Sequence, residues 1–267
     1  MSSDSNLIAV RRNCGSARFA FTSRLGGVSE GPFDSLNMGL HVGDDDADVE
    51  TNRQLALDAL GIGHRLPLEA QQIHGANVAA ISHCDLTTNH GRYVAPSSDA
   101  LVTPIRGSVA LVLFFADCVP VFLATGGGDL IGLAHAGWRG TAAGIAGQAV
   151  LRMTEGTLCP APRGPLHAVI GPSVGICCYE VGEEVAEAAL TTIPESARAG
   201  FVRDGSKAGK YHVDLAGISG RQLRDAGVPA SNIEIIRRCA CCENDTFFSV
   251  RGDGAGTGRC AAIAWLD

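Results

Sequence analysis

The sequence lacks an excess of positive charge. It holds 21 lysines and arginines against 28 aspartates and glutamates, which gives a formal net charge of −7 at pH 7. Nonspecific binding to DNA or to an anionic membrane depends on a basic surface. The charge balance therefore argues against nucleic acid and membrane as partners. An anionic small molecule stays compatible, because a local site can be positive within an acidic protein.

Long apolar segments are also missing. The first residues, MSSDSNLIAVRR, contain no apolar stretch of the length that a signal peptide needs. The most apolar run, SVALVLFFADCVPVFLAT, is interrupted by Asp117 and Pro120 and is too short and polar to span a bilayer. We therefore expect a soluble, cytoplasmic protein. In that compartment the ten cysteines are expected to be thiols or metal ligands rather than disulfides.

Aromatic residues are few, at 5%, whereas the 34 glycines are spread along the chain and indicate tight turns rather than disorder. No linker, charge block or repeat divides the sequence, so we expect one domain over residues 1–267. Extended apolar runs alternate with helical patterns without a regular βαβ repeat, which favours a mixed-sheet α+β fold over a doubly wound one. Strands are expected at ARFAFTS, LVLFFA, LIGLAHA, LHAVIGP, IEIIRRC and CAAIAWL, and helices at 46–60, 141–155, VGEEVAEAAL and DLAGISGRQLRDAG.

The expected helix 46–60 carries an arginine on its apolar face. Val49, Ala56 and Leu57 define that face. Arg53 falls on the same face, four residues after Val49. A long arginine can extend to the rim of such a face while its charged end stays in water. Alternatively, a guanidinium held against the protein needs an anionic partner, and a phosphate or carboxylate of a ligand would serve.

Three segments end an extended apolar run with a side chain that can bind a metal ion. His74 lies in QQIHGANV, Cys118 in FFADCVP and His135 in LAHAGWRG. Two imidazoles and one thiolate are suited to zinc, and three protein ligands leave a fourth position for water or substrate, as in catalytic sites.

Two other interpretations of these residues are open, since their long spacing is not that of a zinc finger. The histidines could be bonded to the backbone at strand ends beside an inert cysteine. Alternatively, Cys118 could be a nucleophile with His135 as its base, and Asp117 or another carboxylate would orient the imidazole.

A second group of cysteines, Cys239, Cys241 and Cys242, lies in RCACCENDTFF and has no matching pair at zinc-ribbon spacing. Cys177 and Cys178 could supply one, but adjacent cysteines seldom ligate the same metal ion. We therefore expect buried or partly buried free thiols at these positions.

Two glycine-rich segments and several histidines carry weaker signals. GPSVGICCYEVG, which begins at Gly171, is expected to form either a backbone cradle for an anion or a tight turn. In FFSVRGDGAGTGR, Arg251 and Arg259 are candidates for contact with a substrate phosphate or for pairing with surface acids. The remaining histidines, which include His41 and His90, are expected at surface or hydrogen-bonded positions.

Side by side, these segments resemble the laccase-domain family, historically called multicopper polyphenol oxidases and now regarded as purine nucleoside phosphorylases. The matching segments run in family order and cover nearly the whole chain. They are TSRLGGVSEGPFDSLNMGLHVGDD, NRQLAL, QQIHGANV, SDALVT, ADCVPVFLA, AHAGWRGT, GPSVGICCYEVGEEV and FFSVRGDGAGTGR. The chain departs from the family pattern at Gly252, where the family usually has a second basic residue after the arginine of FFSxR.

The resemblance implies a mixed-sheet α+β fold with helices around a sandwich-like β core. It also implies a zinc site made by His74, Cys118 and His135. Family members are credited with phosphorolysis of adenosine, inosine and methylthioadenosine, and with adenosine deamination. Copper-dependent phenol oxidation is the older assignment, and a link to peptidoglycan editing is also described for the family.

We therefore interpret the chain as a zinc-dependent purine nucleoside phosphorylase, with adenosine deamination as a second candidate activity. Zinc, or copper in its place, would act as a Lewis acid while phosphate displaces the purine. The alternatives are a copper phenol oxidase, which needs more ligands than the three found here, and a noncatalytic zinc protein that binds cell-wall precursors. A monomer or small homo-oligomer is expected. Candidates for phosphate or substrate binding are Asn37, Arg53, Arg139 and Gly171.

Overall fold

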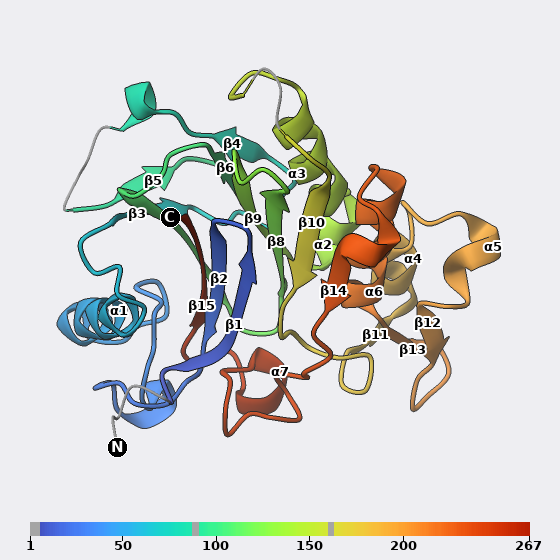
Figure 1. Cartoon of the computed structure of the whole chain (residues 1–267). Helices are drawn as coiled ribbons and strands as arrows, with labels where there is room; N and C mark the ends of the chain where they lie inside the picture. Colours follow the sequence, from blue (N-terminus) through green and yellow to red (C-terminus); the bar gives the residue numbers. More distant parts are fainter. Residues whose placement is uncertain (1–5, 87–90, 160–162) are drawn as a thin grey trace.

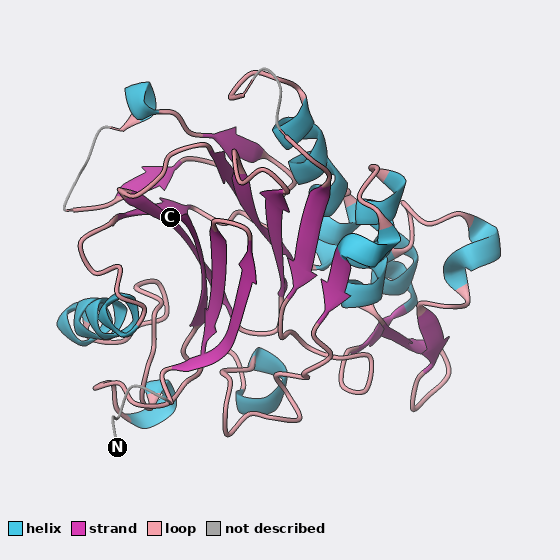
Figure 2. Cartoon of the chain, viewed as in Figure 1, coloured by secondary structure: helices cyan, strands magenta, loops and turns pink. Residues whose placement is uncertain are grey.

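The computed structural model describes residues 6–86, 91–159 and 163–267. Two six-stranded sheets pack face to face, and helices cover the outer face of each sheet (Figures 1 and 2). This arrangement confirms the expected α+β fold, a sandwich-like core of mixed sheets flanked by helices. Residues 1–5 and His90 lie outside the described residues, so the expectations that concern them stay predictions.

The first sheet combines antiparallel and parallel pairs. Its strands, in spatial order, are β1 (Ile8–Cys14), β2 (Ala17–Thr22), β15 (Cys260–Leu266), β7 (Val109–Phe115), β3 (Leu66–Ala70) and β5 (Tyr93–Ala95). The pairs from β1 to β7 are antiparallel, and β3 is parallel to both β7 and β5. Every residue of β7 and β15 is buried because both faces of the sheet are covered, which explains their continuous apolar sequences.

The second sheet is also mixed. Its strands, in spatial order, are β14 (Ile233–Ile235), β10 (Leu166–Ile170), β8 (Val119–Thr125), β9 (Ile131–Ala136), β6 (Ala100–Thr103) and β4 (Val78–Ala80). The inner pairs from β10 to β6 are antiparallel, whereas the outer strands β14 and β4 pair in parallel. Strands β8 and β9 are buried along their whole length, so His135 on β9 lies within an apolar strand.

The apolar core has three layers. Between the sheets, Phe19 and Leu111 of the first sheet meet Phe122 and Leu133 of the second. A second layer joins the outer face of the first sheet to one helix, and a third joins the outer face of the second sheet to four helices. These helices are α1 (Asp46–Ala59) on the first sheet, and α2 (Trp138–Ala142), α3 (Ile145–Thr154), α4 (Glu183–Ala189) and α6 (Leu215–Asp225) on the second.

Capping side chains set the starts of two predicted helices. The carboxylates of Asp45 and Asp214 accept hydrogen bonds from backbone N–H groups in the first turns of α1 and α6. The prediction of one helix over 141–155 is wrong, because this segment holds the end of α2 and then α3. Gly144, between them, adopts a left-handed φ of 77°, which interrupts the helical hydrogen bonds.

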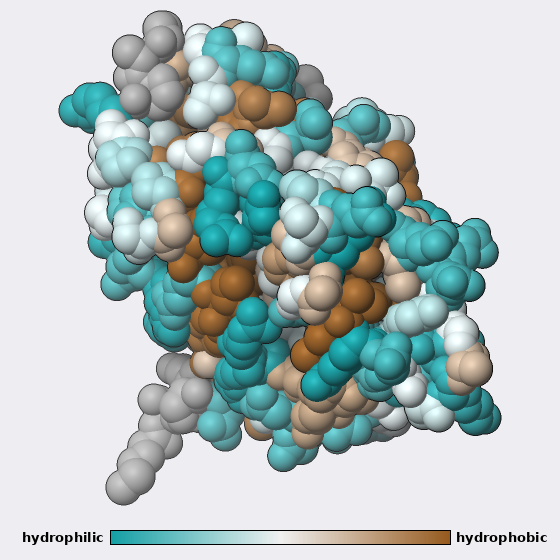
Figure 3. All heavy atoms as spheres, turned by 90° about the vertical axis from the view of Figure 1, so that its right-hand side faces the viewer, coloured by the Kyte–Doolittle hydropathy of each residue, from teal (hydrophilic) through white to brown (hydrophobic). Residues whose placement is uncertain are grey.

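A third, small sheet and several short helices complete the fold. They are β11 (Glu180–Gly182), β13 (Lys210–Val213), β12 (Val202–Asp204), α5 (Glu195–Arg198), α7 (Val250–Asp253) and 3-10 turns at Gly31–Phe33, His83–Asp85 and Ala230–Asn232. Figure 3 turns the end with α4, α5 and α6 toward the viewer, where hydrophilic residues surround separate apolar areas. None of the helices in the described ranges has the length and apolar character needed to cross a membrane.

Candidate metal centre and substrate cavity

Three connections lead from the first sheet to the second, and each carries a polar residue. His74 lies between β3 and β4, Asp99 between β5 and β6, and Cys118 between β7 and β8. His135 joins them from β9 of the second sheet. The donor atoms of His74, Cys118 and His135 lie within 4.8 Å of one another, so the fold brings together the three ligands that the sequence indicates.

Asp99 holds the histidine ring and a ligand loop in place. Its buried carboxylate faces Nδ1 of His135 through Oδ1 at 3.0 Å, and the same oxygen accepts the backbone N–H of His74 at 2.9 Å. Oδ2 accepts the N–H of Gly75 at 2.7 Å. A carboxylate on the outer nitrogen of a ligating histidine fixes its tautomer and leaves Nε2 for the metal. Asp99 is not among the residues predicted from the sequence, where its only signal is a single acid before a buried strand.

The loop before Cys118 is fixed by Asp117. The backbone of Asp117 is left-handed, with a φ of 89°, a conformation that is uncommon for residues other than glycine. Its carboxylate accepts the hydroxyl of Ser249 at 2.6 Å and the backbone N–H of Arg251 at 2.8 Å. These contacts engage both carboxylate oxygens, so the role of orienting His135, considered for Asp117 from the sequence, falls to Asp99.

Glycines after His135 leave room for the donor atoms. A Cβ at Gly137 would lie 3.1 Å from Sγ of Cys118 and 3.2 Å from Cδ2 of His74. A Cβ at Gly140 would lie 2.8 Å from a backbone oxygen of the loop that carries His74. The small residues of HAGWRG therefore let the start of α2 pass directly beside the centre.

The charges of Cys118 and His135 are coupled. Burial would raise the pKa of the Cys118 thiol, but His135 and His74 outweigh burial and lower that pKa to about 6. Burial would lower the pKa of His135, but Cys118 and Asp99 outweigh it and raise that pKa to about 9. The thiol is therefore ready to lose its proton at neutral pH, and the thiolate is the form that binds metal ions. Two imidazoles, one oriented by a carboxylate, and one thiolate fit zinc with an open coordination position.

In metal-free protein, alkylation of Cys118 by iodoacetamide is expected to accelerate as the pH rises through about 6 and to level off above it. The reason is that the thiolate reacts, whereas below this pH the sulfur is protonated. Peptide-resolved mass spectrometry measures the rate. Cys260 is the internal control, because burial raises its pKa to about 12. A midpoint near the ordinary thiol pKa of about 8.5 would contradict the coupling with His135.

The Asp99→Asn variant is expected to bind metal about 10- to 100-fold more weakly than the wild type. The carboxylate serves His135, His74 and Gly75 with two oxygens, whereas the amide has one oxygen and would place its NH2 group against an N–H donor. Competition with a chromogenic chelator measures the affinity. Asp129→Asn, at a surface acid outside the centre, is the control, and equal affinities for the two variants would argue against an orienting role.

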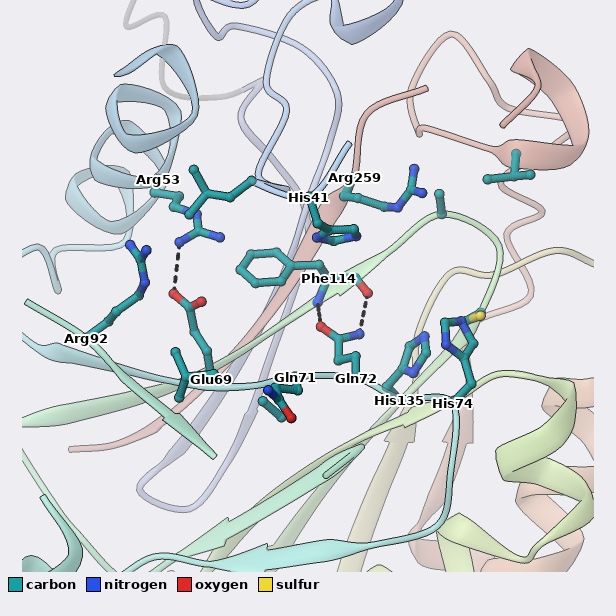
Figure 4. A pocket seen from close by; sticks show the side chains of 16 residues that line it. His41, Arg53, Glu69, Gln71, Gln72, His74, Arg92, Phe114, His135 and Arg259 are labelled. Atoms are coloured by element: carbon teal, nitrogen blue, oxygen red, sulfur yellow. Dashed lines mark hydrogen bonds and ion pairs between the residues drawn. The ribbon is translucent and has the colours of Figure 1, made fainter. Parts of the chain in front are cut away.

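A cavity of about 470 Å³ opens beside the three ligands (Figure 4). Its size lies in the range of small-molecule sites. Apart from the metal ligands, the described titratable groups that line it are four basic side chains, His41, Arg53, Arg92 and Arg259, and one acid, Glu69. This acidic protein thus has a locally basic cavity, as an anionic substrate requires.

Of the four residues suggested from the sequence for substrate binding, Arg53 alone lines the cavity. The side-chain amide of Asn37 is engaged within its own loop and by the backbone N–H of Arg259. Arg139 is exposed and stacks on the neighbouring tryptophan, with Cζ 4.2 Å from the ring centroid. Gly171 packs against a proline ring, where a Cβ would approach to 2.8 Å. These three residues therefore do not line the cavity.

The guanidinium of Arg53 has a protein carboxylate as its partner. Nη1 donates to Oε1 of Glu69 at 3.0 Å, and Nε donates to the carbonyl of Met38 at 2.9 Å. Cζ lies 4.5 Å from the ring centroid of Phe114. The side chains of Arg53 and Glu69 are only 10% and 8% exposed. Of the two alternatives left open by the sequence, the structure supports an anionic partner for Arg53, and that partner is a protein carboxylate rather than a ligand.

His41 and Arg259 line the same cavity, and Figure 4 shows them between the Arg53–Glu69 pair and the metal ligands. His41 is exposed, which agrees with the surface position expected from the sequence, but its place in the cavity was not predicted. Burial, and then the nearby Arg259 and Arg53, lower the pKa of His41, which keeps its ring neutral near pH 7. The guanidinium of Arg259 donates to two backbone carbonyls, and no carboxylate of the described residues forms a salt bridge with it. It is therefore available to an anionic ligand.

The fold and the site together define a mixed α+β protein with a His/Cys/His group that could hold a metal ion at the junction of two sheets. The family model described as "Multi-copper polyphenol oxidoreductase laccase" matches residues 18–267. The chain belongs to this family, which confirms the resemblance found in its motifs.

Relatives match nearly the whole chain. "Purine nucleoside phosphorylase YlmD" of Geobacillus stearothermophilus is 41% identical over 262 residues, which cover 94% of this chain and 92% of that protein. "Purine nucleoside phosphorylase YfiH" of Escherichia coli is 37% identical over 245 residues, 92% of either chain. The crystal structure of G. stearothermophilus YlmD matches with a TM-score of 0.85 at 39% identity, covering 95% of this chain and 93% of that one. The structure of Bacillus licheniformis YfiH gives 0.89 at 33% identity, covering 100% and 98%.

Proposed function

We propose that this protein is a zinc-dependent purine nucleoside phosphorylase that takes adenosine, inosine or methylthioadenosine together with inorganic phosphate. The observation that carries the proposal is the basic cavity that opens at the His/Cys/His donor set. Relatives with phosphorylase in their names match this chain over nine-tenths of its length, which supports the same assignment.

The metal ligands and the basic side chains have separate tasks in this proposal. Zinc held by the three donors would supply Lewis-acid stabilisation of the charge that develops during displacement of the purine. Arg259 offers its guanidinium to phosphate, because a planar fork of N–H donors matches two phosphate oxygens. His41, neutral near pH 7, can donate a further hydrogen bond to phosphate. Asp99 keeps the ring of His135 in position throughout.

The apolar part of the cavity lining suits a planar base. Phe114, Val94 and Leu40 provide apolar lining. The amide of Gln72 is engaged on both sides by the backbone of Phe114, since Nε2 donates to its carbonyl at 2.8 Å and Oε1 accepts its N–H at 2.9 Å. Gln72 therefore fixes the shape of this wall, and the purine would contact a preformed apolar surface.

The alternatives have less support. The relatives' names specify phosphorolysis, so deamination of adenosine enters as an outcome of the assay. A multicopper oxidase needs several copper sites, whereas the described residues form two groups that could hold a metal, one of them with three ligands. A noncatalytic zinc protein has no need of a basic cavity at its metal centre. A cytoplasmic location and the oligomeric state stay predictions.

Product analysis with metal-quantified protein tests the proposal. Adenosine is incubated with and without phosphate, and the products are separated by chromatography. We expect free adenine and ribose 1-phosphate only when phosphate is present. Inosine formed without phosphate would assign deamination instead, and unchanged nucleoside under all conditions would refute the phosphorylase. Dye oxidation with added copper does not discriminate, since adventitious copper at a His/Cys site can cause it.

The Arg259→Ala variant is expected to raise KM for phosphate about 10- to 100-fold, because a charge-assisted hydrogen bond is worth about 1.5–3 kcal/mol. KM for adenosine should change much less. Arg139→Ala is the matched control, since Arg139 lies outside the cavity and is exposed. A phosphate defect in Arg139→Ala with normal kinetics in Arg259→Ala would reverse the assignment.

A further inference from the structure

Four cysteines from two distant segments converge outside the cavity. Cys177 and Cys178 lie between β10 and β11, and Cys239 and Cys242 lie between β14 and α7. Their four sulfur atoms lie within 4.8 Å of one another. Sγ of Cys242 is 3.5 Å from that of Cys177 and 3.4 Å from that of Cys178. From this group we propose a second, structural zinc site, with four thiolate ligands and no position for substrate.

The spacing of the sulfur atoms fits a single tetrahedral ion. With Zn–S bonds of about 2.3 Å, neighbouring sulfurs of a tetrahedral site lie about 3.8 Å apart. The distances from Cys242 to Cys177 and Cys178 are close to this value. A disulfide requires sulfurs about 2.05 Å apart. Four protein ligands close the coordination shell, which is typical of structural zinc and differs from the three-ligand centre beside the cavity.

The backbone is shaped to let the sulfurs meet. The N–H of Gly175 donates to Sγ of Cys239 at 3.2 Å. A Cβ at Gly175 would lie 3.0 Å from Sγ of Cys177 and 3.3 Å from Sγ of Cys239, so a larger residue there would press on two ligands. The two segments are also joined by an isolated parallel β-bridge, in which the N–H of Ser173 donates to the carbonyl of Arg238 and that of Ala240 donates to the carbonyl of Ser173.

Because adjacent cysteines seldom share a metal ion, the sequence predicts free thiols at these positions rather than a metal site. In the structure, however, the chain forms a turn in which the N–H of Cys178 donates to the carbonyl of Gly175. This turn places both Cys177 and Cys178 beside Cys242. Cys239 and Cys242 then supply the C-x-x-C pair typical of zinc knuckles. Cys241 lies outside the group of four and packs against the apolar core.

A metal ion here would brace the loops beside the first centre. The segment that carries Cys177 also contains Val174, whose N–H donates to the carbonyl of Asp117 at 2.9 Å. The segment that carries Cys242 runs on to Ser249, whose hydroxyl donates to the carboxylate of Asp117. Both segments thus support the residue before Cys118. The second site would hold them together from outside without touching substrate.

Zinc stoichiometry tests the proposal. Protein purified under reducing conditions and dialysed free of excess metal is expected to contain two zinc ions per chain by mass spectrometry of the element. Cys118→Ala and the double variant Cys239→Ala/Cys242→Ala should each contain one, and the triple variant none. Cys241→Ala, which changes a neighbouring cysteine outside the group, is the matched control and should keep two.

Cobalt substitution gives a spectroscopic measurement of the same site. Thiolate-to-cobalt charge transfer grows with the number of Co–S bonds, so the wild type with four cysteines at one site and one at the other should show a strong band. Cys118→Ala should keep about four fifths of it, since four of the five cysteine ligands remain. A single zinc in wild-type protein that Cys118→Ala removes, a band that Cys118→Ala abolishes, or a disulfide among the four cysteines of reduced protein would each overturn the proposal.

Discussion

The Cys118→Ala variant is expected to lose the metal ion of the His/Cys/His centre and to lower kcat/KM for phosphorolysis by on the order of 10³-fold. Cys118 would be the one anionic ligand of the three, so its removal is expected to release the metal ion. Without the metal ion, no Lewis acid would stabilise the charge that develops as the purine leaves. His74→Ala and His135→Ala should behave in the same way. Elemental analysis and initial rates, measured on the same samples, check that metal and activity fall together.

The control for this prediction is Cys84→Ala, which removes an exposed cysteine outside the centre and should leave metal and rate unchanged. Full turnover by a metal-free Cys118→Ala variant would eliminate the metal mechanism. Loss of activity with the metal content unchanged would favour the alternative in which Cys118 is a nucleophile and His135 its base.

The Arg53→Ala variant is expected to lower the free energy of unfolding by about 3–5 kcal/mol. It removes the cation that compensates Glu69, whose carboxylate is 8% exposed, and also the contact with Phe114. Burial raises the pKa of Glu69 and lowers that of Arg53, whereas the attraction between the two charges opposes both shifts. Each charged form is therefore stabilised by the other. Urea denaturation followed by circular dichroism measures the change.

A double-mutant cycle separates the pair from its surroundings. Arg53→Met and Glu69→Leu should each destabilise the protein, because each leaves one buried charge without its partner. The double variant Arg53→Met/Glu69→Leu should recover much of the loss, since an apolar pair of similar volume often replaces a buried ion pair without cost. Strictly additive losses would show that the two side chains do not interact. If the rate of the Arg53→Ala variant depends on phosphate in the same way as that of the wild type, Arg53 has no part in phosphate binding.

The sequence was most informative for features that depend on a single strand, such as its burial or the residue at its end. The continuous apolar runs of β7 and β15 predicted buried strands, and they are buried on both faces because the sandwich and its outer helices cover both sides. The three candidate metal ligands could be selected because each combines a side chain that can bind a metal ion with a strand end, and the structure brings their donor atoms together. The break between α2 and α3 at Gly144 was missed, because a single glycine inside an apolar helical pattern is usually tolerated.

Residues whose role depends on several connections could not be selected in this way. Asp99 and His41 become meaningful only when three crossings between the sheets and the loop before α1 meet, and no spacing in the sequence encodes that meeting. The anionic partner of Arg53 was missed for the same reason, since Glu69 lies on β3 and Arg53 on α1. The proximity of Cys177 and Cys178 to Cys242 was likewise not predicted, because it depends on the turn at Gly175.

The crossing of the chain from one sheet to the other has a consequence for stability as well as for chemistry. His74 and Cys118 lie on crossings, and His135 lies inside the second sheet, so an ion bound by all three is a cross-link between the halves of the sandwich. By mass action, metal at 100 times its Kd adds about 2.7 kcal/mol to the folded state. The resistance of the whole sandwich to unfolding would therefore follow the supply of metal, and a shortage of metal would lower the amount of folded protein as well as its activity.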